Sequence, residues 1–96
     1  MTQAPRNQIL HDIHAQMDEH AKVPATTTLE WAMWYEKLGS LWGMFAANTG
    51  EGHGSACSAY SRAAEKYREL GSDNGAADCR DLARKYANLA DMKGKQ

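Results

Sequence analysis

Apolar residues recur along this chain at the three- and four-residue spacing of an α-helix, and no segment alternates with the period of a strand. Four stretches carry this helical pattern, and residues typical of helix starts and stops separate them. The stretches cover about residues 5–22, 27–48, 55–70 and 74–92. The pattern therefore predicts an all-α fold, and an antiparallel four-helix bundle accounts for it directly.

The first predicted helix has an apolar face that includes a histidine. Pro5 suits the first turn of a helix, and the helix must end before Pro24, because the residue before a proline is pushed out of the helical conformation. His20 lies in the middle of the apolar face, where a histidine is typically hydrogen-bonded in a core or at an interface. The other residues of this face are Ile9, Leu10, Ile13 and Met17.

The second predicted helix is the one around which the chain is organised. Thr27 and Glu30 have the spacing of a capping box, which marks the helix start. At 100° per residue its side chains divide into three faces. The aromatic face holds Trp31, Trp34, Tyr35, Leu38, Leu41, Trp42 and Phe45. The small-residue face holds Ala32, Gly39, Gly43 and Ala46, and the third face holds Met33, Lys37, Ser40 and Met44.

Each face of this helix predicts a different role. We expect the aromatic face to supply the core. Gly39 and Gly43 each cost about 1 kcal/mol relative to alanine inside a helix, so we expect a neighbouring element to approach them closely. The alternative is a break at Gly39, and we favour a continuous helix. The Met33, Lys37, Ser40 and Met44 face, together with His20, is the predicted interaction surface.

The remaining two helices are bounded by glycine-rich and polar segments. Residues 48–54 read NTGEGHG and predict a flexible connection, after which Ser55 is expected to cap the third helix. Gly71 is expected to end that helix, and Ser72 or Asp73 to cap the fourth. Gly94 then ends the fourth helix, and residues 93–96 are expected to fray.

Small and aromatic residues recur at fixed spacings from about residue 31 to residue 90. The pattern begins with Tyr35, Leu38, Gly39 and Trp42, and it continues in Ala56, Tyr60 and Ala63, in Tyr67–Gly71, in Gly75–Ala77, and in Leu82, Ala83, Tyr86 and Leu89. This part of the chain resembles the helical hairpins of tetratricopeptide repeats, in which the first four of these residues match positions 4, 7, 8 and 11. The resemblance requires a connecting loop about five residues longer than usual, and it implies a helical-hairpin protein that binds other polypeptides.

Length and composition indicate one globular domain over residues 1–96. The net charge is −1, but residues 1–54 carry three Lys or Arg against six Asp or Glu, whereas residues 55–96 carry eight against six. This mild asymmetry does not favour nucleic-acid binding. Because no apolar run resembles a signal peptide or a membrane span, we expect a cytoplasmic protein, of a bacterium or of a host cell if a phage encodes it.

The two cysteines are expected to remain reduced. Cys57 and Cys79 fall near the starts of two consecutive predicted helices. If these helices run antiparallel, the two residues are offset by roughly 13 Å, which is beyond the reach of a disulfide. We therefore expect two buried free thiols.

Few residues offer catalytic or metal-binding chemistry. His11, His14 and Asp18 share one face of the first helix and form a weak candidate metal site that lacks a fourth ligand. The glycine loop has neither a dinucleotide nor a phosphate-binding motif, and its His53 and Glu51 have no nearby nucleophile. The sequence thus predicts no catalytic residues, no cofactor and no enzyme activity.

The sequence therefore favours a non-enzymatic module that binds another protein or a second copy of itself. A concrete form is a small inhibitor or adaptor, encoded by a phage or a bacterium, that docks on a larger target. Two alternatives of other classes stay open. One is a small-molecule binder with a pocket lined by Trp31, Trp34 and Trp42, and the other is a metal-binding bundle.

Overall fold

In the computed structural model, the described residues run from 6 to 94, and they form four α-helices without a strand. The helices are α1 (Arg6–Ala21), α2 (Thr28–Thr49), α3 (His53–Glu69) and α4 (Asp73–Gly94). The predicted all-α fold is confirmed. The expected helix start at Pro5 and the last two residues of the expected tail lie outside the described residues.

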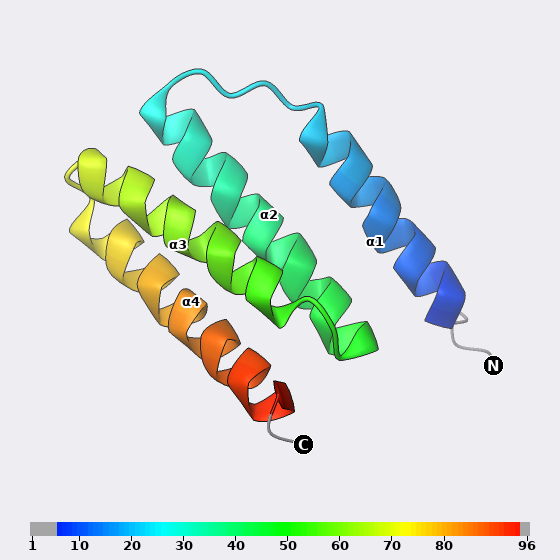
Figure 1. The fold of residues 1–96 in the computed structure, drawn as a ribbon. Helices are drawn as coiled ribbons and strands as arrows, with labels where there is room; N and C mark the ends of the chain where they lie inside the picture. Colours follow the sequence, from blue (N-terminus) through cyan, green and yellow to red (C-terminus); the bar gives the residue numbers. More distant parts are fainter. Residues whose placement is uncertain (1–5, 95–96) are drawn as a thin grey trace.

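The helices pack in chain order, each against the next one. Figure 1 shows α2, α3 and α4 side by side, with α1 on the opposite side of α2 and at a wider separation. The contacts of α1 with α2 are much sparser than those of α3 with its two neighbours. The molecule is thus a closely packed trio of helices to which α1 is added at one edge. None of the described helices is both long and apolar enough to cross a membrane.

The capping box at the start of α2 is formed as predicted. The Glu30 backbone N–H donates to Thr27 Oγ1 at 3.1 Å, and the Thr27 N–H donates to Glu30 Oε1 at 3.0 Å. The same carboxylate oxygen accepts from the backbone N–H and the hydroxyl of Thr26. Hydrogen bonds from the backbone of Thr26 and Thr27 lower the pKa of Glu30 from 4.5 to about 2. The helix then continues without a break at Gly39 to Thr49.

The core is built on the small-residue face of α2 rather than on its aromatic face. All four small residues of that face are buried, together with Leu41, whereas Trp31, Trp34 and Trp42 are only half-buried. The expectation that the aromatic face makes the core therefore holds only in part, for Leu41, which is completely buried, and for Tyr35, which packs against the buried cluster. Buried side chains of α1, α3 and α4 complete the core, namely Ile13, Ala56, Ala59, Tyr60, Ala63, Ala64, Ala76, Cys79 and Ala83.

Tyrosine rings fill the space that the glycines leave. A Cβ atom added to Gly39 would lie 2.8 Å from the ring of Tyr60, and one added to Gly43 would lie 2.9 Å from Cζ of Tyr86. The two tyrosine rings stack with centroids 5.9 Å apart. The predicted close approach along this face is confirmed, and tyrosine side chains from α3 and α4 make it.

Two helix boundaries differ from the prediction. Helix α3 begins at His53, so Ser55 lies inside its first turn, and the N-cap is Gly52 with a positive φ of 97° and no side-chain cap. Gly52 lies against Trp42, which leaves no room for a side chain at this point. Gly71 follows α3 with φ of 76°, as expected for a glycine that ends a helix. Helix α4 includes Lys93 and Gly94, which were expected to begin the frayed tail.

Both cysteines are free, as predicted. Cys79 is completely buried, whereas Cys57 is half-buried. Burial, together with the negative charges of Glu36 and Asp78, raises the pKa of the Cys79 thiol from 9.0 to about 11.

Candidate binding trough along α2

A row of exposed side chains runs along α2 on the side that no other helix covers. The row repeats at intervals of three or four residues, so its members fall within an arc of about 80°. Met33 is 56% exposed, and Leu29 and Met44 are 49% and 42% exposed. We call this row the Met33 stripe, and it consists of Leu29, Met33, Lys37, Ser40 and Met44.

The Met33 stripe forms the floor of a trough between α1 and α3. Three adjoining hollows of about 300, 460 and 540 Å³ meet along it. Met33 and Lys37 each line two of these hollows, and so do His20 and Val23 at the end of α1. The other wall is formed by Tyr60 and Tyr67 of α3. We call this feature the α2 trough. Three residues of the predicted third face, Met33, Lys37 and Ser40, line it, and Met44 continues the row beyond it.

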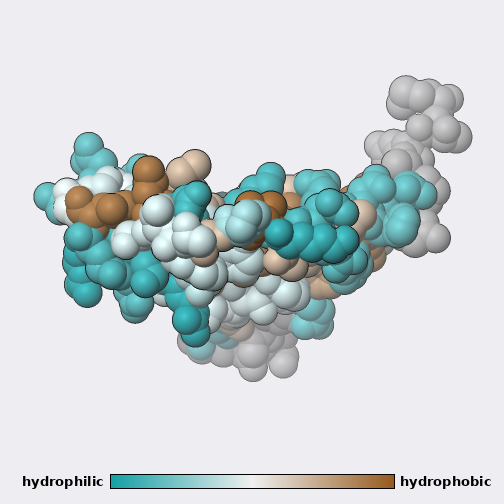
Figure 2. Space-filling model, turned by 90° about the horizontal axis from the view of Figure 1, so that it is seen from above, coloured by the Kyte–Doolittle hydropathy of each residue, from teal (hydrophilic) through white to brown (hydrophobic). Residues whose placement is uncertain are grey.

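Apolar side chains break an otherwise hydrophilic surface near the α1–α2 connection. Val23 in this connection is 50% exposed, and it lines the same hollow as Met33. Figure 2 shows the molecule from the end that carries this connection, with separate hydrophobic patches among hydrophilic side chains. The trough therefore opens at this end onto a surface of mixed character.

His20 joins α1 to α2 through two reciprocal hydrogen bonds. The Trp34 indole N–H donates to the backbone carbonyl of His20 at 3.1 Å. His20 Nε2 lies 2.8 Å from the backbone carbonyl of Trp34, and a carbonyl can only accept, so this nitrogen carries a proton. The two rings also stack with centroids 4.8 Å apart. His20 thus holds α1 against α2 and also forms part of the trough wall. We call its two hydrogen bonds with Trp34 the His20 clasp.

A carboxylate that is hydrogen-bonded to a tyrosine lies on the α3 side of the trough. The Tyr67 hydroxyl donates to Glu36 Oε1 at 2.7 Å, which links α3 to α2. Burial, together with this hydrogen bond and the charge of Glu36, raises the pKa of Tyr67 far above its ordinary value of 10.0, so the phenol remains a donor. The bond fixes the direction in which the Glu36 side chain extends.

The three tryptophans of the predicted pocket do not come together. Trp31 and Trp34 are in edge-to-face contact with centroids 5.6 Å apart, and Trp34 lines one hollow of the α2 trough. Trp42 lies about two turns further along α2, against Phe45 and Gly52. The glycine loop does reach Trp42, but the hollow that contains Trp34 is lined by neither of the other two tryptophans.

The candidate metal ligands are not arranged as a site. The ring of His14 turns towards α2 and contacts Phe45 edge to face, with centroids 5.3 Å apart, instead of joining His11 and Asp18. Among the described residues, no group of three or more histidine, cysteine, aspartate or glutamate side chains could hold a metal ion.

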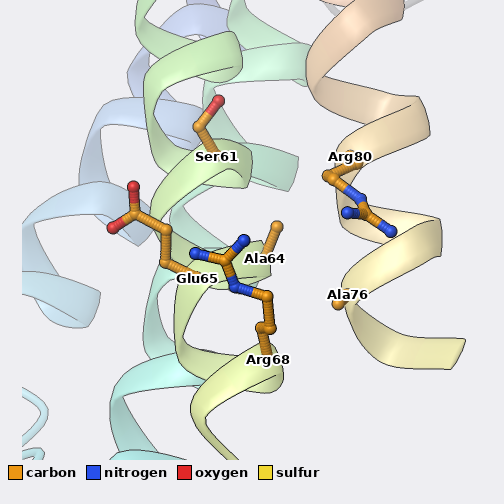
Figure 3. Close-up of a pocket in the computed structure, with 6 residues that line it drawn as sticks. All are labelled: Ser61, Ala64, Glu65, Arg68, Ala76 and Arg80. Carbon is orange, nitrogen blue, oxygen red and sulfur yellow. The ribbon is translucent and has the colours of Figure 1, made fainter. Parts of the chain in front are cut away.

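A smaller hollow of about 240 Å³ lies between α3 and α4. Its floor is formed by Ala64 and Ala76, and Arg68 and Arg80 flank it from opposite helices (Figure 3). In this view Glu65 points away from α4. On α3, Lys66 and Glu69 form an ion pair at 3.4 Å.

Sequence reasoning missed the residues that give the trough its shape and charge. Glu36 was not singled out, because its partner Tyr67 is 31 positions away and no local pattern connects them. Val23 and Leu29 were missed because each lies at the edge of a helix, where periodicity says little about exposure. The spacing of Leu29 from Met33 by four residues was the available signal.

Searches against family models, curated proteins and solved structures identified no match to this chain.

Proposed function

We propose that this chain is a non-enzymatic protein-binding module that receives another polypeptide in the α2 trough. The observation that carries the proposal is the Met33 stripe, in which three large apolar side chains are each more than two-fifths exposed along one helix. Methionine is enriched at protein interfaces, and its flexible side chain adapts to different partner surfaces. The resemblance to tetratricopeptide hairpins supports the same proposal, because proteins of that kind bind polypeptides on helical surfaces.

Affinity capture with two matched variants tests this function. Met33→Asp places a charge on the floor of the trough, whereas Met92→Asp places the same charge on a methionine of α4 that is 62% exposed. We expect wild type and Met92→Asp to retain the same protein from a lysate of the encoding organism, and Met33→Asp to lose it. The captured protein is then purified and its affinity for all three chains is measured by calorimetry.

Light scattering of the purified chain covers the case in which the bound polypeptide is a second copy. A dimer that Met33→Asp converts to a monomer, and that Met92→Asp leaves intact, supports the proposal. A chain that remains monomeric and retains nothing in a Met33-dependent manner contradicts it.

A further inference from the structure

The α2 trough combines apolar side chains with one oriented negative charge. Leu29 and Met33 precede Glu36 on α2 by about two turns and one turn, and all three line the same hollow. Glu36 is half-buried there, so a ligand can still reach it. An occupant that follows the floor of the trough would contact apolar side chains first and then this carboxylate.

Glu36 forms no ion pair with any described residue. Among the described residues, the ion pairs are Lys22 with Glu19 and Lys66 with Glu69, and neither involves Glu36. Its hydrogen bond is to the Tyr67 hydroxyl, which carries no charge. Negative charge from Glu36 also contributes to the raised pKa values of Tyr60 and Cys79, which are neutral neighbours. The carboxylate thus acts on three neutral groups, Tyr60, Tyr67 and Cys79, and forms no ion pair among the described residues.

Lys37 is the one basic residue that lines this hollow. It follows Glu36 directly, so the two side chains leave α2 about 100° apart. Lys37 is exposed and also lines the hollow on the α1 side of the trough. Lys37 thus borders the hollows on both sides of the stripe, whereas Glu36 is held towards α3 by Tyr67.

We infer that the polypeptide bound in the α2 trough is an amphipathic helix that places a lysine or arginine against Glu36. This inference rests on the proposed function and specifies the chemistry of the partner. The apolar side of the helix would cover Leu29 and Met33, in the way amphipathic helices lie in grooves between helices. A guanidinium or ammonium group one or two turns further along would pair with the carboxylate that Tyr67 orients.

Selection of helical peptides from a displayed random library tests this inference without knowledge of the natural partner. The library is selected against the wild-type chain, and each binder is then measured against Met33→Asp, Glu36→Gln and Lys37→Gln. Glutamine at position 36 keeps an oxygen that accepts from Tyr67, so the fold is preserved while the charge is lost. Lys37→Gln is the matched control, since it removes the opposite charge from the adjacent residue.

We expect binders that require Met33 to carry lysine or arginine at one fixed position of their apolar face. Their affinity should fall about two- to fivefold on Glu36→Gln, in the range for a partly exposed charge pair. Lys37→Gln should leave the affinity equal or higher. Circular dichroism of each variant verifies that the helices are intact.

Two other outcomes separate the inference from the function on which it rests. Binders that require Met33 but show no basic preference, or that bind Glu36→Gln equally well, overturn the inference and leave the proposed function standing. A library that yields no Met33-dependent binder contradicts the proposed function, and the inference with it.

Discussion

The aromatic ring of Tyr60 lies directly against Gly39, so closely that a Cβ at this glycine would stand 2.8 Å from two ring carbons. Tyr60 is buried, and its ring is backed by the ring of Tyr86 at a centroid distance of 5.9 Å. It therefore has little freedom to withdraw. The contact between α2 and α3 depends on the absence of one methyl group.

Gly39→Ala should lower the stability of the fold. Alanine improves helix propensity by about 1 kcal/mol, but the overlap with Tyr60 should cost about 1–3 kcal/mol. The free energy of unfolding should therefore fall by up to about 2 kcal/mol. Urea denaturation followed by circular dichroism measures the change. Gly54→Ala is the control, since nothing lies within 4 Å of a Cβ there, and it should be neutral or stabilising. Equal stability of Gly39→Ala and wild type would show that the tyrosine can move aside.

His20→Ala should release α1 selectively. It removes the hydrogen bond to the Trp34 carbonyl and the stacking of the two rings, which are central to the sparse contacts of α1 with α2. Hydrogen exchange followed by mass spectrometry should show faster exchange in α1, with α3 and α4 unchanged. Trp34→Phe removes the indole donor but keeps an aromatic ring that can stack on His20, so a smaller effect is expected. An equal loss of protection in all four helices would argue against a separately held α1.

Glu30 should make stability dependent on pH under acidic conditions. Its pKa is lowered to about 2 in the folded chain from an ordinary 4.5, so between these values the unfolded chain binds more protons. The contribution of Glu30 is therefore present above about pH 4.5 and is lost as the pH falls towards 2. Thermal melting of wild type and Glu30→Gln should show a steeper loss of stability for wild type in this window. Parallel pH profiles would contradict the prediction.

The two cysteines should react with thiol reagents at very different rates. A pKa of about 11 for Cys79, against an ordinary 9.0, reduces its thiolate fraction about a hundredfold near neutral pH, and complete burial slows its reaction further. Cys57 is only half-buried. Mass spectrometry after brief alkylation should find one label, on Cys57, and the Cys57→Ser variant should remain unlabelled until it is unfolded. Rapid labelling of Cys79 in the folded chain would reveal local opening of α4.

Local signals in the sequence predicted the helices well. The reciprocal hydrogen bonds of Thr27 and Glu30 are formed, and Gly71 adopts the left-handed conformation at the end of α3. These features depend on residues a few positions apart. The start of α3 was misplaced because Ser55 is a favourable cap by residue type, whereas the chain turns earlier at Gly52 against Trp42.

The pattern of apolar residues could not predict contacts between residues that are far apart in the sequence. Periodicity divided α2 into three faces correctly, but it could not say that Tyr60 and Tyr86 would fill the spaces at Gly39 and Gly43. The glycine face became the core because tyrosines from other helices supply the missing volume. Periodicity likewise indicated the Met33 stripe, apart from Leu29. It could not show that Tyr67, which is distant in the sequence, orients a carboxylate beside the stripe.

The helices are attached unequally, and this separates the stability of the core from the width of the trough. In small proteins these two properties are usually coupled. The tyrosine–glycine contacts that hold α2, α3 and α4 together lie on one side of α2, and α1 is fastened on the other by its own clasp. If the trough binds a polypeptide as proposed, changes at this clasp would alter the width of the trough while the main core keeps its stability. Mutation at the clasp would then change which polypeptides bind without first weakening the scaffold itself.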